Sequence, residues 1–130
     1  MKSLDIKRLV SGTLITLSSA FSFAETSITV EWAPFVIQSQ VTKEQVINAA
    51  DQVNLKFLSA QKGFIKRQLV QKSTTEFADI VHWKSLADAQ AAGDKVMSCK
   101  TCISYFALMD MSKSEAAGGG FSHYKILKNW

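Results

Sequence analysis

The sequence is poor in the residues and motifs that mark many specialised classes of protein. Its 130 residues include one proline, two cysteines and six glycines. Two cysteines cannot build the disulfide framework that holds many small secreted domains together. No nucleophile elbow or zinc-protease motif occurs, and the glycine run Gly118–Gly120 precedes a predicted strand rather than the helix of a phosphate-binding loop. The sequence therefore lacks the hydrolase and nucleotide-binding signatures that these motifs define.

The first 24 residues show the order of a cleavable secretory signal. Three basic residues among the first eight precede a mostly apolar stretch, Leu9–Leu17, and small residues stand at Ser22 and Ala24. The uncharged run that ends at Ala24 contains serines and threonines, and it is shorter than the roughly 20 apolar residues of a spanning helix. We expect cleavage after Ala24, a periplasmic or secreted location, and no membrane attachment afterwards.

The remaining segment, residues 25–130, has the length of one domain with a modest core. The whole chain has a formal net charge of +4, but part of that excess belongs to the signal segment. Lys66-Arg67 is the only basic pair in the rest, and a pair is far from the basic patch that nucleic acid requires. Nucleic acid is therefore not an expected partner.

The pattern of apolar residues predicts an α+β domain. Thr42 and Gln45 form the signature of a capping box that starts a helix, and Gly63 marks where that segment ends. Pro34 indicates a bulge or an edge position in the first strand. The predicted elements are a strand over 28–38, a helix from Thr42 to about Gln61, strands over 64–72 and 76–84, a helix after Ser85 that breaks near Gly93, a helix over 99–111, and a strand over 121–128.

This order is that of the ferredoxin-like split βαβ sandwich, with helices on one face of an antiparallel sheet. The other face carries apolar residues such as Val30, Ile80 and Ile126. Because such a face needs cover, we expect a second copy of the chain to pack on it and form a homodimer.

Three segments in this order resemble the antibiotic biosynthesis monooxygenase-like family of the dimeric α/β-barrel superfamily. They are Gly63–Arg67 after a helix, Asp79–Ser85 with its tryptophan at the strand end, and Tyr105–Met109. The resemblance covers nearly all of residues 28–127. It implies a homodimer whose two sheets form a dimeric α/β barrel, with a pocket between sheet and helices in each subunit. Some members oxidise polyketide quinols without metal or flavin, some degrade haem, and many have no assigned reaction.

The residues that carry these activities are only partly present. Haem-degrading members use an asparagine on the first strand, the tryptophan that ends the third strand and a histidine about ten residues later. This chain has Trp83, but Ala33 lies near the place of the asparagine and Gly93 near that of the histidine. We therefore expect that haem is not a substrate. Of the asparagine, tryptophan, arginine and tyrosine of the quinol-oxidising members, only Trp83 is matched, although Tyr105, Tyr124 and Asn54 could reach the pocket.

Three side chains are the catalytic candidates. Trp83 could stack on a flat ligand and donate one hydrogen bond, or it could simply fill the core. Asp79 is four residues away on the same face of the strand, where it could act as a base or pair with Lys66 or Arg67. Tyr105 is a second acid/base candidate. His82 should point to the opposite face of the strand, and a structural role is expected for it.

Cys99 and Cys102 stand three residues apart at the start of a predicted helix, where a disulfide is compatible with their spacing. Cys102 continues an apolar stripe, so we expect the bridge to be structural rather than turned over. The alternative is a thiol-redox protein that uses Cys99 and Cys102, or a soft-metal protein in which neighbouring methionines join these two cysteines as ligands.

Taken together, the sequence predicts an exported homodimer that binds a small, flat, apolar molecule and needs no cofactor. As an enzyme it would be a cofactor-independent monooxygenase. The alternatives are a non-catalytic ligand-binding or structural dimer and the thiol or soft-metal protein.

Overall fold

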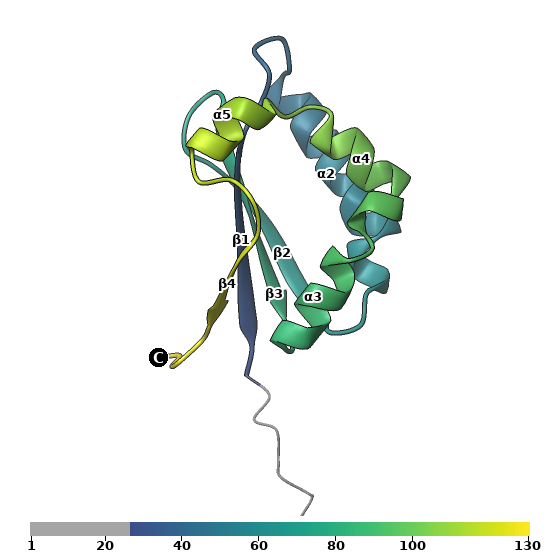
Figure 1. Ribbon diagram of the computed structural model, residues 1–130, viewed down its shortest axis with the longest axis vertical. Helices are drawn as coiled ribbons and strands as arrows, with labels where there is room; N and C mark the ends of the chain where they lie inside the picture. Colours follow the sequence, from purple (N-terminus) through teal and green to yellow (C-terminus); the bar gives the residue numbers. More distant parts are fainter. Residues whose placement is uncertain (1–26) are drawn as a thin grey trace, which may run out of the picture.

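The computed structural model describes residues 27–130, and the predicted signal segment with its cleavage point lies outside the described residues. Four antiparallel strands form one sheet in the order β2-β3-β1-β4. Most of the helices lie together on one face of this sheet and leave the other face open, and the short helix before the last strand lies at the end of the sheet (Figure 1). The predicted α+β, ferredoxin-like split βαβ fold is confirmed. Within residues 27–130, no helix is long and apolar enough to cross a membrane.

The elements occur in the predicted order with one addition, a further short helix before the last strand. Two short 3-10 turns, Leu58–Ala60 and Val96–Ser98, also occur. The strands and helices are β1 (Thr29–Val36), α2 (Lys43–Lys56), β2 (Phe64–Gln71), β3 (Glu76–Trp83), α3 (Leu86–Gly93), α4 (Lys100–Phe106), α5 (Met111–Ala116) and β4 (Ser122–Lys125). The first 3-10 turn thus lies between α2 and β2, and the second lies between α3 and α4.

Local sequence explains where several elements begin and end. The Thr42 hydroxyl accepts a hydrogen bond from the Gln45 backbone N–H, and the Gln45 side chain accepts one from the Thr42 N–H, so α2 starts with the predicted capping box. Ser85 caps α3 by accepting from the Asp88 N–H. Gly63 has a φ of +80°, and a Cβ there would collide with the Asp88 side chain. Only glycine therefore fits at this turn.

The predicted helix over 99–111 is confirmed in its first half and wrong in its second, because the chain leaves the helical path after Phe106. The Leu108 carbonyl accepts a hydrogen bond from the Gln38 N–H, and Met109 bridges to Ile37, so this segment pairs with the chain just beyond β1. The added helix, α5, comes next. Its Ser114 hydroxyl is buried and hydrogen-bonds to both the N–H and the carbonyl of Val36. Contacts with distant chain, rather than local preference, set this part of the fold.

Pro34 lies in β1, which is a central strand of the sheet, at the end of β1 that β4 does not cover. Its partner on β3 is Ala78, while the pairing of β1 with β4 ends at Trp32 opposite Ser122. On the β4 side, Pro34 therefore has no strand opposite it. The missing N–H of proline costs no ladder hydrogen bond at this position.

The two faces of the sheet differ in character. The helix face packs into the core, where Trp83 is 1% exposed and Val46 fully buried. The open face carries three cross-strand rows of neighbours. These rows are Val70–Ala78–Pro34, Gln68–Ile80–Trp32–Ser122 and Lys66–His82–Val30–Tyr124. Trp32, Val70 and Tyr124 are exposed there, so the apolar open face expected from the sequence is present.

Candidate functional site

A hollow lies between the helix face of the sheet and the helices, next to Trp83. Its volume is about 50 Å³, which is room for a few water molecules. Most of the lining is apolar, with charged side chains from β1, β2 and β3 on the sheet side. The lining residues are Glu31, Ala33, Val53, Phe57, Leu58, Arg67, Asp79, Val81, Trp83, Ala92, Gly93, Val96, Cys102, Tyr105, Phe106 and Phe121.

Asp79 is held by two partners on different elements. Arg67 on β2 donates from Nε to one carboxylate oxygen at 2.8 Å, and the Tyr105 hydroxyl of α4 donates to the other at 2.9 Å. Arg67 also donates from a terminal nitrogen to the Ala50 carbonyl of α2 at 2.8 Å, and its guanidinium lies over the Tyr105 ring. This Arg67–Asp79–Tyr105 network therefore joins β2, β3, α2 and α4 at one buried point.

The surroundings fix the protonation states of the network. Burial works against the charge of Arg67, but the Asp79 carboxylate outweighs it and raises the pKa of Arg67. Burial, and then the charge of Asp79, raise the pKa of the Tyr105 hydroxyl well above its usual value. Tyr105 is thus a neutral hydrogen-bond donor at any physiological pH. Because both Asp79 oxygens are engaged, the network is better suited to hold the cavity wall than to remove a proton from a ligand.

A second buried acidic group, Glu31, was not among the sequence candidates. It sits on β1 opposite His123 of β4, and the His123 Nε2 lies 2.7 Å from its carboxylate. Burial raises the pKa of Glu31, against the opposing effect of His123; the nearby charge of Asp79 adds to the rise. Glu31 lines the cavity, so it is the carboxylate best placed to accept a proton there. One signal was available: an acidic residue at an inward position of an otherwise apolar strand.

The raised pKa of Glu31 predicts the direction in which the stability of the protein changes with pH. Because the folded state holds this proton more tightly than the unfolded state, the Glu31 contribution to stability falls as pH rises above about 4.3. As pH rises from about 4.3 to the raised pKa of Glu31, a Glu31→Gln variant should therefore gain stability relative to the parent, by at most about 1.4 kcal/mol per pH unit. Urea unfolding of both proteins from pH 4 to 8 measures the difference. The exposed Glu115→Gln serves as control, and a parent–variant difference that shrinks with rising pH would contradict the assignment.

Trp83 lines the cavity and carries an unsatisfied donor. It is 1% exposed, its ring packs edge-on against Phe64 at 5.9 Å, and its indole Nε1 has no hydrogen-bond partner within the part of the chain that the structure describes. The Glu31 carboxylate is near enough for the indole to favour its ionised form, but it does not reach hydrogen-bond geometry. A buried N–H without an acceptor is uncommon, because it costs the full desolvation penalty.

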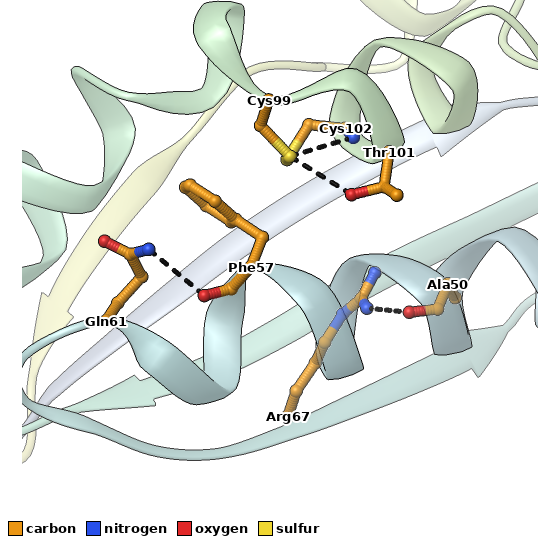
Figure 2. The surroundings of a disulfide bond; sticks show 7 residues. All are labelled: Ala50, Phe57, Gln61, Arg67, Cys99, Thr101 and Cys102. Carbon is orange, nitrogen blue, oxygen red and sulfur yellow. Dashed lines mark hydrogen bonds between the residues drawn. A yellow bond between two sulfur atoms is a disulfide. The ribbon is translucent and has the colours of Figure 1, made fainter.

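Cys99 and Cys102 are joined by a disulfide, with their Cα atoms 5.2 Å apart. Cys102 is 2% exposed and lines the cavity, whereas Cys99 faces a separate groove on the outer surface. Figure 2 shows Phe57 of the α2 end close to the bridge, and Phe57 lines both the cavity and the groove. With both thiols in the bridge, the soft-metal alternative loses its thiolate ligands. No cluster of three or more histidine, cysteine or carboxylate residues that could hold a metal ion occurs between residues 27 and 130.

The structure brings Trp83, Asp79 and Tyr105 to one cavity and leaves other named residues outside it. His82 and Tyr124 lie together in one row of the open face. Burial, and then the charge of Lys66, lower the pKa of His82, which keeps it neutral at physiological pH. Asn54 lines a different hollow, between α2 and β2.

Comparison with solved structures shows that the fold is that of the antibiotic biosynthesis monooxygenase-like proteins. SnoaB, a cofactor-independent oxygenase from Streptomyces nogalater, superposes with a TM-score of 0.63 at 10% identity, covering 79% of this chain and 96% of SnoaB. A Chloroflexus aurantiacus protein assigned to the antibiotic biosynthesis monooxygenases matches with a TM-score of 0.52, 10% identity, and 80% and 97% coverage. The haem-degrader MhuD from Mycobacterium tuberculosis matches with 0.50, 14% identity, and 79% and 98% coverage. No family model and no curated protein sequence matches the chain.

Proposed function

We propose that this chain is an exported domain that binds a small, flat, apolar molecule with one hydrogen-bond acceptor in the cavity beside Trp83. The observation that carries the proposal is that Trp83, which lines a mostly apolar cavity, has a buried indole N–H without a partner among the described residues. A carbonyl or phenolic oxygen of the ligand would accept a hydrogen bond from this donor, and the apolar lining would pack against the ring of the ligand.

A ring-sized ligand needs more room than the cavity now has. A volume of about 50 Å³ is a third of the roughly 150 Å³ that accommodates benzene in an apolar protein cavity. Among the lining side chains that the structure describes, Phe121 is the exposed one, at 48%, and it comes directly after the three glycines Gly118–Gly120. Since glycines permit many backbone conformations, a shift of Phe121 is the simplest way to enlarge the cavity.

The test uses two probes that differ in one property, 1,4-naphthoquinone with its carbonyl acceptors and naphthalene without them. We expect the quinone to shift the Trp83 indole N–H signal in a proton–nitrogen NMR spectrum and to bind about 10-fold more tightly than naphthalene. Trp83→Phe should remove this preference while leaving naphthalene affinity within about 3-fold. A quinone that saturates the protein without moving the Trp83 signal would contradict the proposal.

An oxygenase is a second candidate, supported by the shared fold with SnoaB and by Glu31. A cofactor-independent oxygenase needs a base to ionise its quinol substrate, and Glu31 lies at the cavity with His123 behind it. Oxygen uptake with 1,4-naphthohydroquinone in the presence of a chelator tests this function. Uptake at the rate of protein-free autoxidation would leave the ligand-binding domain as the function.

Export and dimerisation belong to the same proposal. The charged start and apolar run of residues 1–24 support export, and so does the Cys99–Cys102 bridge, because disulfides persist mainly in oxidising compartments. The apolar rows of the open face support a homodimer in which two sheets face each other. N-terminal sequencing of the exported protein should begin at Glu25.

A further inference from the structure

The two sulfurs of the disulfide lie in different surroundings. Cys102 is 2% exposed and packs into the core beside the helix-side cavity. Cys99 is half-buried at a shallow surface groove formed by the ends of α2, α3 and α4. Because Cys99 lines this groove and Cys102 does not, a reagent from solvent approaches the bridge from the Cys99 side. This asymmetry directs attack on the bridge to a single sulfur.

The groove around Cys99 is positively charged. Lys56 comes from the last turn of α2, Lys95 lies just after α3, and Lys100 begins α4, so three separate parts of the fold bring an ammonium group to the same groove. No acidic side chain of residues 27–130 lines the groove, and none of these three lysines takes part in an ion pair with a described residue. The positive charge of the groove thus favours the approach of an anionic reagent.

Two polar groups already point at Cys99 Sγ. The Cys102 backbone N–H donates to it at 3.1 Å, and the Thr101 hydroxyl lies 3.2 Å away (Figure 2). When a mixed disulfide on Cys99 is resolved and Cys99 is released as a thiolate, both can stabilise the negative charge on its sulfur, as the lysines also do. The bridge closes a loop with only two residues between the cysteines, so it constrains the unfolded chain less than a longer loop would. Its contribution to stability is correspondingly small.

We propose that Cys99–Cys102, which the sequence predicts to be a purely structural bridge, is instead a thiol–disulfide exchange site for small anionic thiols and their disulfides. A thiolate RS⁻ attacks Cys99 Sγ, the Cys99–Cys102 bond breaks, and Cys102 leaves as a thiolate that takes a proton from water. A second RS⁻ attacks the RS sulfur of the mixed disulfide and releases Cys99 as a thiolate with RSSR. Two electrons pass from two thiolates to the bridge, and the reverse sequence oxidises the dithiol. This activity is independent of the ligand-binding proposal.

The test compares three small thiols of different charge: anionic 2-mercaptoethanesulfonate, neutral 2-mercaptoethanol and cationic cysteamine. Rates of bridge reduction are measured by thiol trapping and mass spectrometry at low ionic strength and divided by the thiolate concentration of each reagent. We expect the anionic thiol to react at least about 10-fold faster than the cationic one, and the advantage to fall to about 2-fold in roughly 1 M salt. In Cys102→Ser, the mixed disulfide should form on Cys99.

The matched control separates the groove from net charge. Lys56→Gln with Lys95→Gln and Lys100→Gln should abolish the preference for the anionic thiol. Lys43→Gln with Lys72→Gln and Lys84→Gln changes the net charge equally and should retain it. Equal rates for all three thiols, or a rate of reduction equal to the rate of global unfolding in hydrogen exchange, would overturn the proposal and leave a structural bridge.

Discussion

Asp79→Ala should destabilise the fold by about 3–5 kcal/mol, the largest loss expected from a single change in this chain. The substitution leaves the Arg67 guanidinium, whose side chain is 7% exposed, charged and without its carboxylate. It also removes the acceptor of the buried Tyr105 hydroxyl. Because the network joins two strands to two helices, no local rearrangement can restore both partners. Urea or thermal unfolding monitored by circular dichroism measures the loss.

Two further variants distinguish an uncompensated charge from lost packing. Combining Arg67→Met, Asp79→Leu and Tyr105→Phe removes every polar group of the network, and it should recover most of the stability lost in Asp79→Ala. Lys72→Ala breaks the exposed Lys72–Glu76 pair on the same hairpin and should change stability by less than about 0.5 kcal/mol. If the triple variant were as unstable as Asp79→Ala, the network would contribute through its shape rather than its charge.

Trp32→Glu should abolish the proposed homodimer at micromolar concentration, with the dimer dissociation constant raised at least about 100-fold. Trp32 lies on a central strand, in the row Gln68–Ile80–Trp32–Ser122 of the open face, and is 37% exposed in the single chain. In a two-fold dimer each substitution would bury two carboxylates, one from each copy, against apolar surface. Light scattering and analytical ultracentrifugation give the mass and the constant.

Leu55→Glu is the matched control for the dimer. Leu55 is 69% exposed on α2, on the opposite side of the sheet, so the same change from apolar to acidic should leave the dimer intact. Circular dichroism confirms that Trp32→Glu stays folded. A parent protein that stays monomeric at high micromolar concentration, or a Trp32→Glu variant that dimerises like the parent, would show that the open face is not the interface.

The sequence is informative where the cause of a structure is local. The Thr42–Gln45 capping box, the positive φ of Gly63 and the Ser85 cap each depend on residues within a few positions of one another. Alternation along β3 also places Trp83 and Asp79 on the helix face and His82 on the other. The ion pair of Asp79 with Arg67 is one of the two roles that the sequence allows for this carboxylate, and the hairpin of β2 and β3 brings the two residues together.

The features that could not be predicted depend on residues far apart in the sequence. Helix α5 is short, and its Ser114 bonds to Val36 across 78 positions, so no periodic pattern indicates it. Glu31 and His123 are 92 positions apart, and nothing near either residue points to the other. The unpaired Trp83 indole N–H likewise results from how several elements pack, which composition and spacing do not encode.

The central position of β1 also determines when the sheet can be completed as the chain is synthesised and folds. The first strand of the described chain lies between β3 and β4, and the Glu31–His123 contact spans 92 positions. Pairings of such long range make folding slow, because loop closure precedes any gain from contact. A chain truncated before Phe121 would retain β1 as an unpaired edge with an apolar open face, and a strand of that kind is a template for aggregation. We therefore expect a chain that ends before the C-terminal strand to aggregate and to lack the Phe121 wall of the cavity.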